Sequence, residues 1–396
     1  MSVGEKSVIF LLGAGCSCDA AVPVSKVMVE KLEALLKKDK DYDYNDKLYS
    51  LYKYIRCTME YGNKLSDQET CFNVESLLVT LHMLSDYKRA RIYPFIKGYT
   101  DDLREYAGTN FESVNKLIKI IEEELPKWVT LPSYTKAKYY NNFERFQKEL
   151  NFAIRIFSLN YDLCLENNVK CKIETGFIED RPWDGDRFTQ SEDDEKTAIY
   201  LYKLHGSIDW ERNDGQLRKS AQSKIIPDII FGTDVKFQAI DPYLFYLYEF
   251  RKYALASEII ISIGYSFGDK YINDLICQAM NYDINKKLLS VSPTDNESEE
   301  AERIRKELNL TDASGRIIVE KDKAKDFLEK TLTVKYIEAK LPQTDLPSQK
   351  EWGKAAENID GMDKRELYNV CYDNERRNGT EIGYERFYGC GDRNEI

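Results

Sequence analysis

The sequence predicts an α/β fold in which helices cover both faces of a Rossmann-like parallel sheet, with a helical subdomain inserted into it. Short, fully apolar runs such as Val8–Leu12 end in glycine, which is typical of the buried strands of a parallel sheet. In the second half of the chain such runs alternate with helical patterns, an order that favours helices on both faces. Between about residues 45 and 150 the pattern is helical, and no clear β run interrupts it.

The first half begins with the strand candidate Val8–Leu12 and continues into helices. Pro23 and Ser25 precede a helical pattern over residues 27–36. The stretch NVESLLVTLHML starts at a cap-like Asn73 and carries apolar residues at helical spacing. FESVNKLIKIIEEEL and NNFERFQKELN show the same periodicity, so we expect two more helices before the second strand.

Strand and helix candidates alternate in the second half. The strand candidates are FAIRIFSLN, AIYLYKLHG, KIIPDIIFG, EIIISIG and KLLSVSP. The helix candidates are DPYLFYLYEFRKYALA, which is dense in aromatic residues, DKYINDLICQAMNY, and the charged ESEEAERIRKEL.

The length and composition suggest more than one structural unit. A chain of 396 residues, 42% of them hydrophobic, can bury a sizeable core and is too long for one simple core. We expect one domain over residues 1–340 that carries the helical insertion at 45–150. Residues 341–396 turn polar and contain Pro342 and Pro347, so we expect a tail or an interaction element there.

Charge and cysteine content exclude several classes of partner. The net charge of −11 disfavours broad contact with nucleic acid, because phosphate backbones attract basic surfaces. The nine cysteines show no paired framework, which favours reduced intracellular thiols. The apolar run at Val8–Leu12 is too short for a secretory signal, and no stretch approaches the ~20 apolar residues of a membrane span. We expect a cytoplasmic protein that does not contact a membrane.

The stretch FLLGAGCSCDAAVPVSK suits the binding of a pyrophosphate. A strand runs into Gly13, Ala14 and Gly15, small residues follow, and a helix comes next. Glycines let the backbone turn tightly and approach a ligand, and the N-terminus of a helix offers free N–H groups to an anion. The alternative for this stretch alone is a plain tight turn.

Two further strands end in groups that can perform acid–base chemistry. In SLNYD, Asn160 can hold a hydroxyl or a water, although Asn160 and Asp162 also suit a turn that caps the next helix. His205 in KLHG ends another strand and can accept a proton near neutral pH, or it can simply pack in the turn. We expect Gly206 to clear space for a ribose. His82 lies within an amphipathic helical pattern, and we interpret it as structural.

Small polar residues follow the last two strand candidates. Gly264, Ser266 and Gly268 lie between a strand and a helix in SIGYSFGD, where amides and a hydroxyl suit a phosphate or a ribose. Ser290 and Ser292 end the strand in LLSVSP and suit a ribose or a turn with the following proline.

In this order the five stretches resemble the sirtuin family, and they are most similar to its zinc-free bacterial branch of antiviral NAD hydrolases. GAGCSCDAAVP resembles the family's Gly-Ala-Gly-x-Ser-x-x-x-Gly-Ile-Pro loop, SLNYD its Thr-x-Asn-[Tyr/Ile]-Asp motif, and KLHGSID its His-Gly motif. IIPDIIFGTD resembles the segment that follows, and IGYSFGD the later Gly-x-Ser loop. The resemblance runs from Val8 to Val291 around the insertion, so the domain at 1–340 is expected to bind NAD and to be catalytic.

The chain departs from the family pattern at informative positions. Ala21 and Val22 stand where the family has Gly-Ile, and Leu159 stands where a polar residue is common. No Cys-x-x-Cys pair occurs, whereas sirtuins that deacylate lysine hold a structural zinc with two such pairs. We therefore expect no metal site and no zinc, which argues against a deacylase and for cleavage of NAD with water as the acceptor.

The resemblance implies a role for each candidate residue. Asn160 lies beside the ribose and holds the attacking water, His205 is the general base at the ribose hydroxyls, and Asp162 orients Asn160. The residues implied to bind NAD are Gly13, Ala14, Gly15, Ser17, Pro23, Gly264, Ser266 and Ser292. NAD is the substrate, no other cofactor is implied, and the products are nicotinamide and ADP-ribose.

The resemblance also implies a biological setting and leaves an alternative open. The first hypothesis is an NAD hydrolase that acts as an effector of antiphage defence. The alternative is a non-catalytic subunit that senses NAD or ADP-ribose within a larger defence complex. A dehydrogenase is disfavoured, because no acidic residue follows the glycines by about 20 positions on a second strand. We expect a homo-oligomer and a separate partner, such as a hexameric ATPase of the DNA-translocase type or an Argonaute-like protein, docked on the insertion or the tail.

Overall fold

The computed structural model describes most of the first 342 residues. It divides the chain into a compact unit, Met1–Pro342, and a second unit, Gln343–Ile396. The described residues are 3–4, 7–38, 45–65, 72–86, 101–108, 110–178, 181–189, 197–220, 227–229, 240–311 and 315–342. Nearly all of the expected tail at 341–396 therefore lies outside the described residues.

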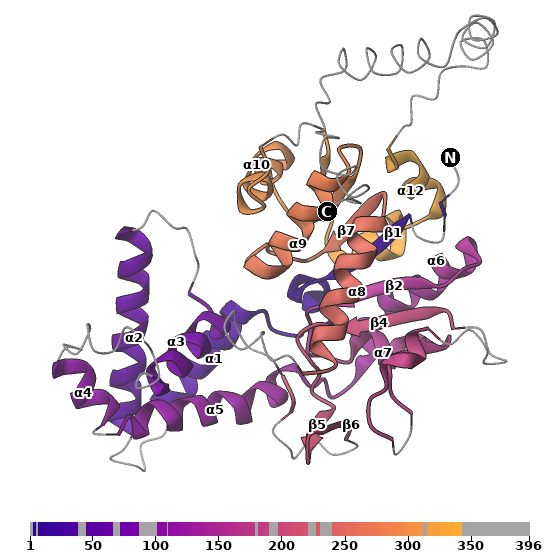
Figure 1. Ribbon diagram of the computed structural model, residues 1–396. Coiled ribbons are helices and arrows are strands. Elements are labelled where there is room, and N and C mark those ends of the chain that lie inside the picture. Colours follow the sequence, from indigo (N-terminus) through magenta and orange to yellow (C-terminus); the bar gives the residue numbers. More distant parts are fainter. Residues whose placement is uncertain are drawn as a thin grey trace, which may run out of the picture. The chain divides into compact units, whose positions relative to one another are not determined.

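Seven parallel strands form the central sheet of the first unit (Figure 1). Their order is β3-β4-β2-β1-β7-β8-β9. The strands are β1 (Val8–Leu12), β2 (Ile154–Ser158), β3 (Ile173–Glu174), β4 (Ile199–Lys203), β7 (Ile259–Ile263), β8 (Lys287–Val291) and β9 (Ile317–Glu320). A separate antiparallel hairpin joins β5 (Trp210–Asn213) to β6 (Gln216–Lys219).

Strand β1 lies at the centre of the sheet and marks the point where the strand order reverses. Leu11 pairs in parallel register with Phe157 of β2 on one side and with Ser262 of β7 on the other. From β1 the chain builds one half of the sheet through β2 and β4, and later the other half through β7 and β8. Such a reversal opens a crevice at the carboxyl ends of the strands, which is where open α/β sheets bind ligands.

The apolar sequence of β1 follows from helices on both faces of the sheet. Phe10 and Leu12 point into one hydrophobic cluster, whereas Ile9 and Leu11 point into the other. Phe10 packs edge-on against Phe143, with ring centroids 5.3 Å apart. Pairs of this geometry contribute about 1 kcal/mol beyond the area they bury. The predicted α/β class, with helices on both faces of a parallel sheet, is confirmed.

Helices alone connect β1 to β2 in the described part of this segment. They are η1 (Ala14–Ala20), α1 (Ser25–Lys38), α2 (Asn45–Leu65), α3 (Val74–Ser85), α4 (Asp101–Ala107), α5 (Glu112–Val129), η3 (Tyr134–Asn141) and α6 (Asn142–Leu150). Asn73 caps α3 as predicted: its side chain accepts from the Ser76 N–H, and the Ser76 hydroxyl accepts from the Asn73 N–H. The helix predicted at residues 27–36 is α1, and the 3₁₀ helix η1, which the sequence did not indicate, lies between it and β1.

The second half contains the predicted helices and several elements that the sequence did not indicate. The predicted helices are α8 (Tyr243–Ala256), α9 (Lys270–Tyr282) and α10 (Glu297–Glu307). The others are α7 (Cys164–Asn168), η4 (Gly185–Phe188), α11 (Ala324–Asp326), the π-helical turn η6 (Phe327–Thr331) and α12 (Val334–Lys340). Most of the strand expected at KIIPDIIFG lies outside the described residues, and Ile229 forms a single bridge to Gly206.

Candidate functional site

A cavity of about 490 Å³ opens at the carboxyl ends of five sheet strands, where the strand order reverses. The segments that line it after these strands are Gly13 to Gly15 after β1, Leu159 to Asp162 after β2, His205 after β4, Gly264 to Ser266, Gly268 and Asp269 after β7, and Ser292 with Pro293 after β8. The opposite wall comes from Val22 to Lys26 and Met28, from Asn73 and Glu75 of α3, and from Val129 of α5.

Ser290, which also suited a ribose, is buried within β8 and does not line this cavity. All but one of the residues to which the resemblance assigns a role do line it. They are Asn160, Asp162, His205, Gly13, Ala14, Gly15, Pro23, Gly264, Ser266 and Ser292. The exception is Ser17, which is fully buried behind the cavity wall. Except for Pro23, which lies on the opposite wall, these residues share one wall although they are up to nearly 280 positions apart, because they follow strands of the same parallel sheet.

The glycines of the first loop permit close backbone packing between the loops after β1 and β7. A Cβ added at Gly13 would lie 2.6 Å from the Gly264 carbonyl oxygen, and one added at Gly264 would lie 2.2 Å from the Cys16 nitrogen. Gly264 also has a φ of +65°, which glycine adopts without strain. The Gly15 N–H donates to the Gly264 carbonyl at 2.9 Å. These glycines therefore fix the floor of the cavity.

The side chain of Asn160 is held by its amide nitrogen. Nδ2 donates to the Gly13 carbonyl oxygen at 2.9 Å and lies 3.4 Å from the Ser17 Oγ. The backbone N–H of Asn160 donates to the Ser158 Oγ at 3.1 Å. Because both amide hydrogens are directed at the protein, the amide oxygen is the atom of this side chain suited to accept from a water or a hydroxyl in the cavity.

Behind Asn160 a buried chain of hydrogen bonds leads to Asp162. Ser17 donates its hydroxyl proton to Asp162 Oδ2 at 2.8 Å, so its own oxygen accepts from Asn160. The Tyr140 hydroxyl, 2.8 Å from the Ser17 Oγ, must then be a donor as well. Asp162 Oδ1 accepts from the Cys164 N–H at 2.9 Å. Asp162 therefore acts on Asn160 through Ser17 rather than by direct contact.

A buried lysine connects the ends of β2 and β4. The Lys203 side chain is 3% exposed, and its ammonium donates to the Asp162 backbone oxygen and lies 3.2 Å from Glu166 Oε1. Burial raises the pKa of the Glu166 carboxyl, and the Lys203 charge opposes that rise. Lys203 is two residues before His205, and Asp162 is two residues after Asn160. The contact between Lys203 and the Asp162 backbone therefore holds the segments that carry His205 and Asn160 together.

His205 contacts a carboxylate on the far side of the crevice. Its Nε2 lies 3.0 Å from Asp269 Oδ2, and the two side chains are 5% and 8% exposed.

The space beside Gly206, which we expected to admit a ribose, is filled by protein: a Cβ there would lie 2.3 Å from the Asp228 carbonyl oxygen. Gly206 thus serves close packing of the chain, and that expectation is wrong.

The turn that departs from the family pattern keeps a glycine-like conformation. Ala21 has a φ of +73°, and its N–H donates to the Ser17 and Cys18 carbonyls where η1 ends. A left-handed conformation costs a residue with a Cβ about 1–2 kcal/mol. Pro23 follows this turn and lines the cavity.

The thiols near the cavity are poor nucleophiles. Burial raises the pKa of the Cys16 thiol to about 12. Burial also raises the pKa of the Cys164 thiol, and the nearby Asp162 adds to that rise. Because the thiolate is the reactive form, neither cysteine is suited to attack a substrate at neutral pH.

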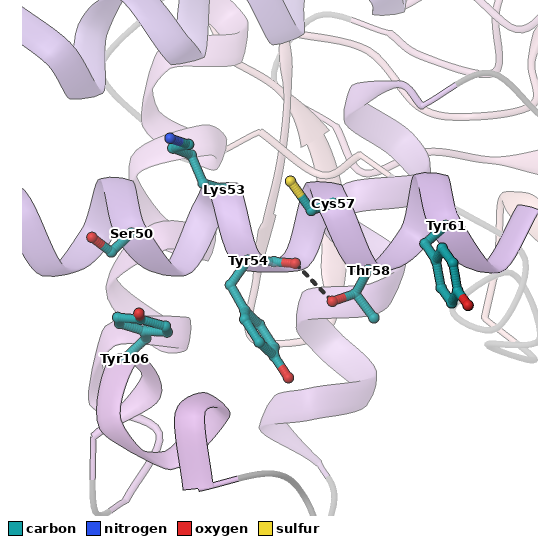
Figure 2. Close-up of a pocket in the computed structure, with 7 residues that line it drawn as sticks. All are labelled: Ser50, Lys53, Tyr54, Cys57, Thr58, Tyr61 and Tyr106. Carbon is teal, nitrogen blue, oxygen red and sulfur yellow. Dashed lines mark hydrogen bonds between the residues drawn. The ribbon is translucent and has the colours of Figure 1, made fainter.

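A second hollow, of about 520 Å³, lies against one face of α2 (Figure 2). Its lining consists of Ser50, Lys53, Tyr54, Cys57, Thr58 and Tyr61 of α2 and Tyr106 of α4. None of these described lining residues is a His, Asp or Glu. Apart from the aromatic content of the insertion, no pattern in the sequence indicated this hollow.

Several residues of the site had no signal strong enough to single them out. Asp269 is the last residue of the stretch IGYSFGD, and an aspartate just before a helical pattern is typical of an ordinary helix cap. Tyr140 and Glu75 belong to the helical insertion, and no local pattern links them to the glycine loop. Glu75 Oε1 lies 3.5 Å from the Ser25 Oγ on the cavity wall.

The described residues show neither a metal-binding cluster nor a membrane-spanning helix. Within the described ranges, no group of three or more His, Cys, Asp or Glu side chains is placed to hold a metal ion. Among the helices of the described residues, none has the length and apolarity needed to cross a bilayer.

Part of the chain matches the model of a known protein family. Residues 154–312 match a family model described as a SIR2-like domain. This segment contains Asn160, Asp162 and His205, whereas the glycine loop after β1 lies outside it. None of the curated proteins matches the chain.

Solved structures similar to the chain include three Sir2 proteins. A mutant Sir2 homologue in complex with 2′-O-acetyl ADP ribose is 11% identical, covers 86% of this chain and 94% of its own, and has a TM-score of 0.42. A complex of a Sir2 homologue with NAD is 12% identical, with 84% and 90% covered and a TM-score of 0.38. A structure on the mechanism and regulation of Sir2 enzymes is 12% identical, with 85% and 93% covered and a TM-score of 0.37. With TM-scores below 0.5, these likenesses carry no conclusion about what the chain does.

Proposed function

We propose that this protein is an NAD glycohydrolase that cleaves the bond between nicotinamide and ribose. The observation that carries the proposal is the placement of an amide, Asn160, and an imidazole, His205, on the wall of one cavity at the reversal point of a parallel sheet. Both residues lie within the segment that matches the SIR2-like domain. A cavity of about 490 Å³ is in the size range of small-molecule sites.

The chemistry requires a held water and a base. The bond between the ribose C1′ and the nicotinamide nitrogen breaks, and its electron pair leaves with nicotinamide, so positive charge builds on the ribose. Asn160 positions a water through its amide oxygen, and the water oxygen bonds to C1′. His205 accepts a proton from a ribose hydroxyl or from this water. The products are nicotinamide and ADP-ribose.

The remaining residues bind the dinucleotide. In this proposal the pyrophosphate lies over the loop of Gly13, Ala14 and Gly15 on the cavity wall. Ser266 and Ser292, with Gly264 and Pro23, contact the ribose and the rest of the nucleotide. Ser17 and Asp162 hold Asn160 from behind. No other cofactor and no zinc take part.

The proposal extends to the setting in which the enzyme acts. We propose a cytoplasmic effector of antiphage defence that depletes NAD. It is a homo-oligomer, and a separate protein such as a hexameric DNA-translocase-type ATPase controls it. This part rests on the resemblance of the five sequence motifs. Nicotinamide release by the purified chain, alone and together with the product of its genomic neighbour, tests it.

The direct test measures nicotinamide release from NAD. We expect turnover by the parent chain, or by the chain with its neighbour, and a fall of ~10²–10⁴-fold for Asn160→Ala and for His205→Ala. His82→Ala is the matched control, because His82 is 38% exposed on α3 and does not line the cavity. Parent-like rates for both cavity variants contradict the proposal. Binding of NAD without any release of nicotinamide favours the sensing subunit instead.

A further inference from the structure

The contact between His205 and Asp269 joins elements that are not neighbours in the sheet. His205 follows β4, and Asp269 precedes α9 after β7, with the ends of β2 and β1 between them. Asp269 Oδ2 lies 3.0 Å from His205 Nε2. Both side chains are more than nine-tenths buried, so water screens this interaction little.

Both the carboxylate and the backbone oxygen of Asp269 accept hydrogen bonds that hold this residue in place. Its Oδ1 accepts from the Tyr271 N–H at 3.0 Å and from the Ile272 N–H at 3.4 Å, which caps α9. Its backbone oxygen lies 3.1 Å from the Tyr265 hydroxyl and accepts from the Asn273 N–H at 2.9 Å. One carboxylate oxygen is thus committed to the helix, and the other is presented to the imidazole.

We propose that Asp269 is a positioning residue that fixes the tautomer of His205. An ionised carboxylate can only accept, so the neutral imidazole must carry its proton on Nε2 and keep its lone pair on Nδ1. The negative charge of Asp269 also stabilises the imidazolium that forms when His205 takes up a proton. The catalytic consequence rests on the proposed function, whereas the tautomer is a property of the folded chain alone.

Two substitutions separate this role from simple helix capping. Asn and Ser both cap helices about as well as Asp, so Asp269→Asn and Asp269→Ser should keep α9 intact. In Asp269→Asn the amide oxygen can cap the helix while the NH₂ group faces His205. Nε2 must then accept, and the proton moves to Nδ1. Asp269→Ser removes the contact without imposing the opposite tautomer.

The tautomer can be read by nitrogen NMR of the chain labelled at histidine. The chain has two histidines, so a His82→Gln variant assigns the signals. In the neutral imidazole we expect Nε2–H for the parent and Nδ1–H for Asp269→Asn. A parent ring protonated on Nδ1, or the same tautomer in both proteins, overturns the proposal. This measurement needs no substrate and decides the tautomer even if the chain does not cleave NAD.

Kinetics test whether the tautomer matters for turnover. We expect kcat for nicotinamide release to fall ~10²-fold or more in both Asp269 variants, with a much smaller change in KM. Asp274→Asn is the control on the same helix, because Asp274 is 52% exposed and pairs with Lys270. An inverted tautomer with an unchanged kcat overturns the positioning role. If the parent releases no nicotinamide, the proposed function fails, and the NMR result still stands.

Discussion

At the residue scale, the two histidines of the chain occupy contrasting surroundings. His205 is buried at the cavity and its Nε2 contacts a carboxylate. His82 is 38% exposed in the last turn of α3, with its Nε2 4.0 Å from Glu122 Oε1. The sequence distinguished them because His205 follows a strand whereas His82 continues a helical pattern.

The same logic explains which site residues could be predicted. Asn160, His205 and Gly264 each lie within two residues of the end of a strand, so the local pattern places them at the carboxyl edge of the sheet. Their supports could not be predicted, because those contacts join distant parts of the chain. Tyr140 is 123 positions from Ser17, and Asp269 is 64 positions from His205. No periodicity of hydrophobic residues encodes such a pair.

Ser17 offers a test of the buried chain behind Asn160. Ser17→Ala leaves Asp162 Oδ2 and the Tyr140 hydroxyl without this partner, at a cost of about 1–3 kcal/mol in stability. It also loosens Asn160, so we expect nicotinamide release to slow ~10- to 100-fold. Thermal unfolding and initial rates provide the two measurements.

The matched control removes the Tyr140 hydroxyl, which contacts Ser17 but does not lie between Asp162 and Asn160. Tyr140→Phe deletes only the donor to Ser17 and leaves the contacts from Asp162 through Ser17 to Asn160 intact. We expect a lower unfolding temperature with a turnover close to that of the parent. If Ser17→Ala turns over NAD as fast as the parent, the hydrogen bonds that link Asp162 to Asn160 through Ser17 are not needed for turnover.

At the scale of elements, the site depends on how closely the loops after β1 and β7 approach. Gly13 and Gly15 meet Gly264 backbone to backbone, with no room for a Cβ on any of the three. The adjacent strands pair in register from Val8↔Ile259 to Leu12↔Ile263, which brings the two loops to the same height. The floor of the cavity is therefore formed jointly by the loops after β1 and β7.

Two neighbouring glycines give a sharp test of this packing. In Gly264→Ala the new Cβ would lie 2.2 Å from the Cys16 nitrogen at a φ of +65°, so the loops must separate. We expect a loss on the order of 3 kcal/mol or more in stability, together with weaker NAD binding. In Gly268→Ala the nearest atom is the Ser266 Oγ at 3.5 Å, an ordinary contact, so the stability of this variant should stay close to that of the parent. Equal unfolding temperatures for the two variants would contradict the packing account.

The elements that the sequence missed share a physical cause. The residues of β9, IIVE, are only half-buried at the edge of the sheet, so they lack the fully apolar run that marks a central strand. β3 has two residues, too few for any pattern. Central strands such as β1 and β7 were predictable because helices cover both of their faces and every position except Ser262 is apolar.

At the scale of the whole molecule, the order of the strands creates the site. The chain fills one half of the sheet from β2 to β4 and the other from β7 to β9, and the crevice lies where the two halves meet at β1. The alternation of strands and helices predicts a parallel sheet, but it does not specify this order. The insertion also supplies a wall of the cavity through Asn73 and Glu75, which its helical periodicity does not reveal.

The most direct measurement is a structure of the chain with an NAD analogue whose bond between nicotinamide and ribose resists hydrolysis. We expect the ribose next to nicotinamide to lie within hydrogen-bond distance of the Asn160 amide oxygen and the His205 ring, with the pyrophosphate over Gly13 and Gly15. A dinucleotide bound in the α2 hollow, or in the cavity with that ribose away from both Asn160 and His205, would contradict the proposed site.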